Sequence, residues 1–254
     1  MDRATVVKDG VEILRELSLV MHEDEHVCIL GPNGSGKSTI VSLIAGDQYA
    51  LWRPRAPVRL FGEENWKLFE LRARLGLVSD RLQTEHSRDE TVGDVLLSAF
   101  FGSVGLPLRV RVLPEMREKA ADVASFLGIA GLVDRRTSTL SSGEMRRVLV
   151  GRALVHDPGM LLLDEPFTSL DIAARQGFTR LLRALASRGH TILLVTHDLA
   201  EIPPEIERIV LIKEGAIFAD GPKTDVLNSE IISRLYGIEV RVRREDGRYR
   251  TEVD

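Results

Sequence analysis

The chain has 254 residues, which is enough for one large domain or two small ones with an ample core. Hydrophobic residues make up 44% and charged residues 28%, the composition of an ordinary soluble globular protein. The formal net charge of −4 argues against a protein that coats nucleic acid. The single cysteine, Cys28, excludes an internal disulfide, lacks the Cys/His neighbours of a zinc site, and is expected to be buried in a strand.

No membrane-spanning segment is expected from the sequence. The longest uncharged stretch, Val95–Leu108, is too short and too rich in Gly and Ser to cross a bilayer. The first residues have no apolar core of a secretory signal. We therefore expect a protein that is soluble or peripheral to a membrane.

Short apolar runs separated by helical patterns predict an α/β fold with a mostly parallel core sheet and helices on both faces. The predicted strands are, in chain order, Val27–Leu30, Leu75–Ser79, Met160–Leu163, Thr191–Val195 and Ile209–Ile212.

The middle of the chain, from about Thr91 to Leu140, shows helical patterns and no convincing strand. Pro114 predicts the start of a helix that ends near Gly128. Gly221–Pro222 predicts a turn, after which the tail 223–254 is a small charged appendage.

The stretch CILGPNGSGKST follows an apolar strand and precedes a predicted helix from about Lys37 to Ala45, which is the context of a phosphate-binding P-loop. The glycines allow successive N–H groups to point at phosphate oxygens. Lys37 is expected to reach the β- and γ-phosphates, and the Ser38 hydroxyl to bind Mg²⁺. The residues expected to bind the nucleotide are Gly31, Pro32, Asn33, Gly34, Ser35, Gly36, Lys37, Ser38 and Thr39.

Acidic residues follow the apolar run MLLLDEP, at the end of a strand where ligands bind in open α/β sheets. Asp164 is a candidate Mg²⁺ ligand, acting through water. Glu165 is the candidate general base that polarises the attacking water. His197, at the end of the strand in TILLVTHDL, is a candidate to contact the γ-phosphate or to order that water.

The stretch LSSGEMRRVLVGRAL, residues 140–154, reads as a helix that begins with a capping box between Ser141 and Glu144. Its open N-terminus, with the small Gly143 in the first turn, is a second place where an anion would bind. The alternative is that Ser141 caps the helix and does nothing else.

The stretches GPNGSGKST, LSSGE, LLLDEP, SLD and THD resemble, in their order, the motifs of the ATP-binding cassette (ABC) family of ATPases, over about Ile13 to Pro222. The resemblance implies one cassette: a core with a small antiparallel β part (1–83 and 157–222), a helical subdomain with the signature (84–156), and an appendage (223–254). It implies MgATP sandwiched between two head-to-tail copies. The signature of one copy, together with Asp171 at the seam, would then contact the nucleotide of the other, through Ser141, Ser142, Gly143 and Glu144.

The sequence departs from the family pattern at three places. Glu144 replaces the usual signature Gln, so its carboxylate must turn back to its own backbone if a neighbour's phosphate is to fit. Asp80 stands where the family has a Gln that touches Mg²⁺; Asp80 remains a candidate metal ligand, and Gln83 is the alternative. Lys8 or Val11 stands in for the usual aromatic residue against adenine.

The resemblance implies an ATP-hydrolysing subunit that powers a transporter from the cytoplasmic face of the membrane, through permease subunits, with no nucleic-acid partner. The expected permease contact is Asp80–Arg88 with Phe100–Leu106. The tail resembles ATPases of importers for a metal chelate or an oxyanion. The alternatives are a soluble ABC ATPase in repair or assembly, and a nucleotide-dependent regulator with little turnover.

Overall fold

A computed structural model describes residues 1–86 and 90–252 of the chain. The backbone forms two compact units. We call Met1–Leu71 with Thr191–Asp254 the P-loop unit, and Arg72–His190 the signature unit. None of the described helices is both long enough and apolar enough to cross a bilayer.

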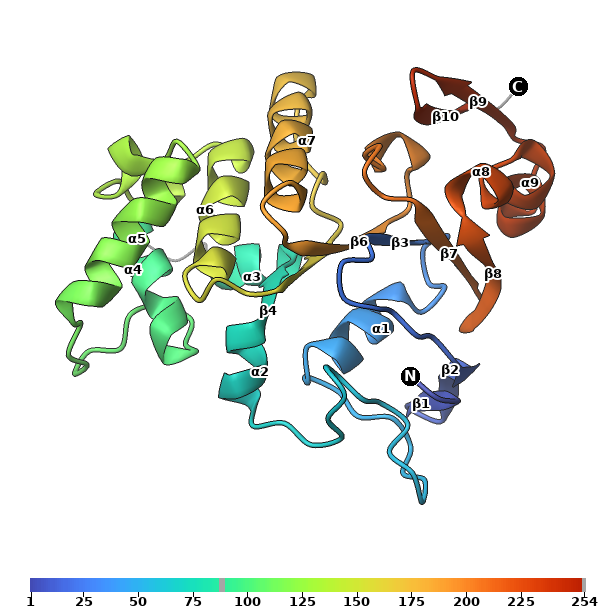
Figure 1. Cartoon of the computed structure of the whole chain (residues 1–254), viewed down its shortest axis with the longest axis horizontal. Helices are drawn as coiled ribbons and strands as arrows, with labels where there is room; N and C mark the ends of the chain where they lie inside the picture. Colours follow the sequence, from blue (N-terminus) through green and yellow to red (C-terminus); the bar gives the residue numbers. More distant parts are fainter. Residues whose placement is uncertain (87–89, 253–254) are drawn as a thin grey trace. The chain divides into compact units, whose positions relative to one another are not determined.

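The P-loop unit contains a sheet with the strand order β6-β3-β7-β8 (Figure 1). β3 (Val27–Leu30) pairs in parallel with both β6 (Thr191–Thr196) and β7 (Arg208–Lys213), while β8 (Ala216–Pro222) runs antiparallel to β7. β3 and β6 are buried along their whole length, Cys28 included, as expected of central parallel strands. Helix α1 (Lys37–Ile44) follows β3 and buries Ile40, Val41, Leu43 and Ile44.

Two antiparallel hairpins complete this unit: β1 (Ala4–Lys8) with β2 (Val11–Leu17), and β9 (Arg241–Glu245) with β10 (Arg248–Glu252), drawn in blue and red in Figure 1. Short helices η4 (Leu199–Glu201), α8 (Lys223–Val226) and α9 (Ser229–Tyr236) lie in the C-terminal part. Helix α2 (Leu68–Arg74) crosses the boundary between the two residue ranges.

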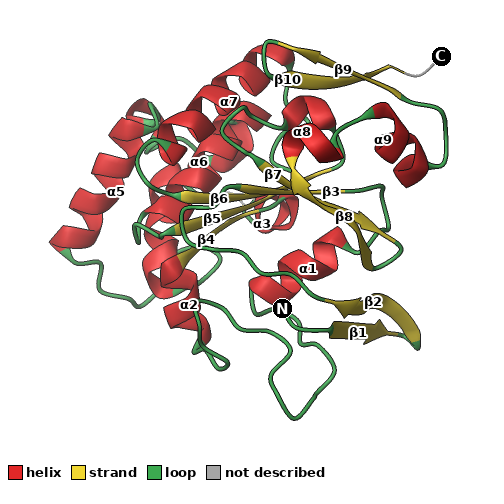
Figure 2. Ribbon diagram, turned by 45° about the vertical axis from the view of Figure 1, so that its right-hand side comes forward, coloured by secondary structure: helices red, strands yellow, loops and turns green. Residues whose placement is uncertain are grey.

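The signature unit pairs β4 (Leu75–Val78) in parallel with β5 (Met160–Asp164). Figure 2 shows its long helices as red ribbons; α6 (Ser142–Leu154) contacts α4 (Val92–Ser98), α5 (Pro114–Phe126) and α7 (Ile172–Ala186). Its remaining helices are α3 (Asp80–Glu85), η1 (Ala99–Phe101), η2 (Ala130–Leu132) and η3 (Thr137–Thr139).

The predicted α/β class with mostly parallel strands is confirmed, and every predicted strand is present to within two residues at either end. The described segment 91–140 contains helices and no strand, as predicted, and adds one isolated bridge between Thr91 and Arg136. The predicted turn at Gly221–Pro222 is wrong, because both residues belong to β8 and pair with Ile209 and Arg208. Proline is tolerated there because β8 is the edge strand of this sheet.

Candidate functional site

The loop between β3 and α1 is built as the sequence predicts. Gly36 is the N-cap residue of α1 and has φ of 105°, a left-handed conformation that glycine adopts without strain. A Cβ at this position would also lie 2.8 Å from Leu14 Cδ2. The loop backbone therefore packs too closely against β2 for a side chain, and Asn33 and Gly34 remain exposed in front of it.

Lys37 is buried with its ammonium group folded over this loop. Its Nζ donates hydrogen bonds to the carbonyl oxygens of Gly31 at 2.7 Å and Pro32 at 3.0 Å. The cation and the N-terminus of α1 therefore lie at the same loop, and both favour an anion.

His197 lies at the same edge of the sheet as the P-loop. β3 and β6 are parallel neighbours, with Leu30 paired to Thr196, so Gly31 and His197 are the next residues on the two strands. His197 is exposed, whereas Thr196 is fully buried. The structure thus places His197 and the P-loop together at the carboxyl ends of two neighbouring parallel strands.

The loop that carries His197 is fixed by contacts that sequence reasoning missed. The Thr196 hydroxyl is hydrogen-bonded to the buried Glu201 carboxylate and accepts a bond from the Asp198 N–H at 3.1 Å. The Tyr236 hydroxyl, from α9, donates to the His197 carbonyl oxygen at 2.8 Å. No sequence signal links residues 39 positions apart, so Tyr236 was not foreseeable.

The two acidic candidates end β5 in the signature unit. Asp164 is the last residue of β5 and is half-buried. Glu165 has φ of 48°, a conformation that is costly for a residue with a side chain and that is concentrated at functional sites. Because Val78 of β4 pairs with Leu163 of β5, the residues after both strands lie at one edge.

Asp80, the candidate metal ligand after β4, is engaged by another side chain. Its Oδ1 accepts a hydrogen bond from Arg146 Nη2 at 2.6 Å, and the Arg146 side chain is 1% exposed. Gln83, the alternative, lies one turn further along α3. Metal binding by Asp80 or Gln83 stays a prediction, and the Asp80 carboxylate has a cationic partner within its own unit.

The N-terminus of α6 confirms the predicted capping box. The Ser141 N–H donates to Glu144 Oε2 at 2.8 Å, and Ser141 Oγ accepts from the Glu144 N–H at 3.3 Å. The bonds from the Ser141 backbone and hydroxyl lower the pKa of the Glu144 carboxyl below its usual value. Glu144 thus folds back to its own backbone, while Ser141 remains exposed.

The same helix end contacts the loop after β5. Ser142 Oγ donates to the Ser169 carbonyl oxygen at 2.9 Å, and a Cβ at Gly143 would lie 3.0 Å from Ala174 Cβ. Asp171 caps α7 by accepting the Ala174 N–H at 2.7 Å and is exposed. The signature residues and Asp171 are therefore neighbours within the signature unit.

The P-loop residues fit the phosphates of a nucleotide. The P-loop supplies glycine backbone and a buried ammonium group for phosphates. No cluster of three or more His, Cys, Asp or Glu side chains in the described residues could hold a metal by itself. Mg²⁺ is usually bound by one or two protein oxygens together with substrate phosphates. The exposed Ser38 of the P-loop unit and the half-buried Asp164 of the signature unit each carry an oxygen donor of this kind. The candidates for contact with the adenine ring, Lys8 and Val11, flank an exposed hairpin turn of the P-loop unit.

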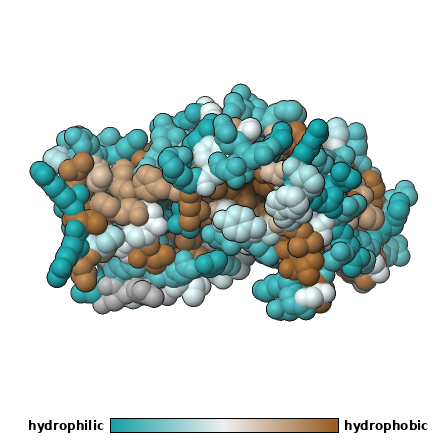
Figure 3. Space-filling view, turned by 90° about the horizontal axis from the view of Figure 1, so that it is seen from below, coloured by the Kyte–Doolittle hydropathy of each residue, from teal (hydrophilic) through white to brown (hydrophobic). Residues whose placement is uncertain are grey.

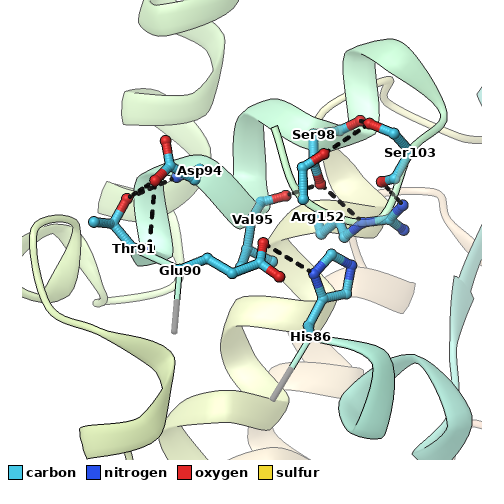
Figure 4. Close-up of polar contacts among 9 residues, drawn as sticks. His86, Glu90, Thr91, Asp94, Val95, Ser98, Ser103 and Arg152 are labelled. Atoms are coloured by element: carbon cyan, nitrogen blue, oxygen red, sulfur yellow. Dashed lines mark hydrogen bonds and ion pairs between the residues drawn. The ribbon is translucent and has the colours of Figure 1, made fainter. Parts of the chain in front are cut away.

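A buried polar cluster lies deeper in the signature unit (Figure 4). His86 Nδ1 lies 3.5 Å from Glu90 Oε2, and Arg152 Nη2 donates to the Ser103 carbonyl at 3.0 Å. Burial, with the charge of Arg152 adding to it, lowers the pKa of His86 to about 4. Burial also lowers the pKa of Arg152 to about 10. At neutral pH the cluster therefore holds a neutral imidazole beside a guanidinium cation.

Comparison with known proteins agrees with this arrangement of motifs. The ABC transporter family matches residues 14–168. The zinc transport system ATP-binding protein TroB of Treponema pallidum is 34% identical over 239 residues, which cover 93% of this chain and 86% of TroB. The hemin import ATP-binding protein HmuV of Rhodopseudomonas palustris is 32% identical over 255 residues, which cover 96% and 90%.

Among solved structures, the ADP conformation of MJ1267, an ATP-binding cassette of an ABC transporter, superposes with a TM-score of 0.73 at 25% identity, covering 92% of this chain and 93% of that one. Fold, motifs and relatives thus agree over nearly the whole length. The chain belongs to the ABC transporter family, as an ATP-binding cassette that hydrolyses ATP.

Proposed function

We propose that this cassette powers an importer of a metal chelate or an oxyanion. The relatives TroB and HmuV are named for zinc transport and hemin import, and these names support a metal-related cargo for this chain. In this proposal the chain acts at the cytoplasmic face of a membrane, bound to permease subunits. In this proposal the permease and its partners select the cargo, and the cassette supplies the energy of ATP hydrolysis.

In the proposed reaction, water attacks the γ-phosphate in line, and the chain acts by positioning and charge stabilisation. The loop N–H groups and Lys37 bind the β- and γ-phosphates. Glu165 accepts a proton from the attacking water, and His197 contacts the γ-phosphate. Mg²⁺, bound by Ser38 and Asp164, would neutralise phosphate charge.

The single observation that carries a two-copy mechanism is the geometry of the α6 N-terminus. The Glu144 carboxylate is hydrogen-bonded to the backbone and hydroxyl of Ser141 within the capping box, and Ser141 is exposed at the helix end. Such an end favours an anion. Since the P-loop binds the chain's own nucleotide, we assign this helix end to the nucleotide of a second copy in a two-fold dimer.

Hydrophobic side chains suited to a protein partner reach the surface of both units. Figure 3 shows them as separate brown patches among hydrophilic ones on the face that it draws. Among the exposed hydrophobic residues of the signature unit are Val104 and Leu108, which lie in or beside the segment 100–106 expected to contact a permease. The other expected contact, Asp80–Arg88, lies partly outside the described residues.

The substitution Glu165→Gln tests the catalytic assignment. It retains the size of the side chain but removes the base, so ATP binding should persist while turnover falls roughly 10²–10⁴-fold. Binding is measured with a fluorescent ATP analogue, and turnover by phosphate release. Turnover within a few-fold of wild type would overturn the role of Glu165.

A second experiment tests the transporter assignment. The untagged chain, purified from detergent-solubilised membranes, should carry a polytopic membrane protein that stimulates its ATPase. Stimulation by nucleic acid, with no membrane partner, would favour a soluble ABC ATPase in repair instead. Nucleotide-driven dimerisation with no hydrolysis would favour a regulator.

A further inference from the structure

Arg146 places a charge in the interior of the signature unit. The side chain projects from the second turn of α6 and is 1% exposed. Two of its nitrogens, Nε and Nη1, are buried and have no hydrogen-bond partner among the described residues. Burying a cation with unsatisfied donors costs free energy, so the folded state needs an anionic partner close to Arg146.

The compensation comes from Asp80. Arg146 Nη2 donates to Asp80 Oδ1 at 2.6 Å, a short charge-assisted hydrogen bond. The same Nη2 lies 3.5 Å from the carbonyl oxygen of Thr168, in the loop after β5. One guanidinium group therefore contacts the first turn of α3 and this loop at once.

A second contact joins the same loop to the same face of α6. Ser142 precedes Arg146 by four residues, so the two side chains project from one side of the helix. Ser142 Oγ donates to the carbonyl oxygen of Ser169, the residue after Thr168. Two consecutive carbonyl groups of the loop after β5 are thus held by α6, two residues before Asp171.

We propose that Arg146 is a positioning residue for ATP hydrolysis, which holds Asp80 and the loop after β5 on the signature helix so that Ser141 and Asp171 keep a fixed spacing. The proposal rests on the function proposed above. It also gives Asp80 a role other than metal ligation, because its carboxylate serves as the counter-ion of a buried cation.

The two partners differ in burial, which predicts an asymmetric response to substitution. Asp80 is 50% exposed and can be solvated when Arg146 is lost, whereas Arg146 would remain a buried, unpaired charge when Asp80 is lost. Asp80→Asn should therefore lower the unfolding midpoint on the order of 10 °C, and Arg146→Met by much less. Combining the two should recover most of the midpoint lost in Asp80→Asn, because the unpaired charge is removed.

The experiment compares wild type, Asp80→Asn, Arg146→Met and the double variant, with Arg147→Met as the matched control on a half-buried neighbour. Thermal unfolding without nucleotide tests the pair independently of ATP. ATP affinity and its Mg²⁺ dependence are then measured by titration, and kcat at a temperature where all variants are folded. Asp80→Asn and Arg146→Met should each lower kcat on the order of 10-fold through misplacement, with ATP affinity and Mg²⁺ dependence as in wild type.

The outcomes separate the roles of Asp80. If Asp80 is a metal ligand, Asp80→Asn weakens the Mg²⁺-dependent part of ATP binding and Arg146→Met does not restore it; that result overturns the proposal. Additive losses of midpoint in the double variant, or kcat unchanged in both single variants, overturn it as well. If wild type itself fails to bind ATP, the function proposed above fails, while the unfolding measurements still report on the ion pair.

Discussion

Two helix N-termini in this chain, those of α1 and α6, meet the same problem in different ways. Both leave backbone N–H groups without intrahelical acceptors. At α6 the side chains of Ser141 and Glu144 accept two of these N–H groups, those of Glu144 and Ser141, in a capping box. At α1 the N-cap is Gly36, which has no side chain to offer, and the residue that follows is a buried lysine.

Under the proposed function, this difference separates two kinds of anion site. No side chain caps the α1 end, so its N–H groups are open to a ligand, which suits a nucleotide that the chain binds by itself. The α6 end is partly capped by its own side chains and exposes Ser141, which suits a phosphate brought by another molecule. A helix end whose ligand arrives only on dimerisation is stabilised in the free chain by a side-chain cap.

Breaking the α1 end should give the largest effect. Gly36→Ala places a side chain at φ of 105° and 2.8 Å from Leu14 Cδ2, so the loop must move. ATP affinity should fall on the order of 10²-fold, as measured by titration. The control is Gly189→Ala, at φ of 89° with nothing within 4 Å of the added Cβ, which should cost about 1 kcal/mol of stability and leave ATP affinity unchanged. An unchanged affinity in Gly36→Ala would contradict the account.

A smaller effect is expected at a third polar site, the buried cluster around His86, where burial disfavours the charged form of the imidazole. The pKa of His86 is lowered to about 4 in the folded chain, against 6.5 when unfolded, so the unfolded state takes up the proton first as pH falls. The contribution of His86 to the free energy of unfolding should be constant above pH 6.5. It should fall by about 2 kcal/mol between pH 6.5 and 4. His86→Gln should lose less over that range, as followed by urea unfolding. Parallel pH profiles would show that His86 does not contribute.

A smaller effect is expected where the cap of α6 is removed. Glu144→Ala should lower the free energy of unfolding by about 1 kcal/mol, whereas Glu144→Gln keeps a side-chain acceptor for the Ser141 N–H and should be nearly neutral. Because the pKa of Glu144 is lowered in the folded chain, its stabilisation is present above the ordinary carboxyl pKa and is lost as pH falls through the folded value. Urea unfolding of wild type and the two variants at pH 7 and pH 4 measures the effect of each substitution and its pH dependence. Equal stability of Glu144→Ala and wild type at pH 7 would show that the Glu144 cap does not stabilise the fold.

The sequence predicted most reliably what depends on local spacing. The P-loop, the capping box and the strands follow from residues a few positions apart, and they appear in the structure almost as expected. Gly221–Pro222 was misread because a turn signal cannot reveal that a residue lies in an edge strand. The contact of Asp80 with Arg146 spans 66 residues and depends on packing, so the sequence alone suggested only a metal ligand at Asp80.

The central claim is that the P-loop and the α6 end act on one nucleotide from different copies, and mixing two inactive variants tests it most directly. Lys37→Ala removes the phosphate-binding cation. Ser141→Asp keeps an N-cap side chain but presents a carboxylate to the phosphate, while Ser141→Asn is its uncharged control. Alone, the first two variants should have almost no ATPase; mixed in equal amounts they should recover roughly a quarter of wild-type activity, because half of the dimers are mixed and each has one intact site. No recovery in the mixture, with mixed dimers shown to form, would contradict the account.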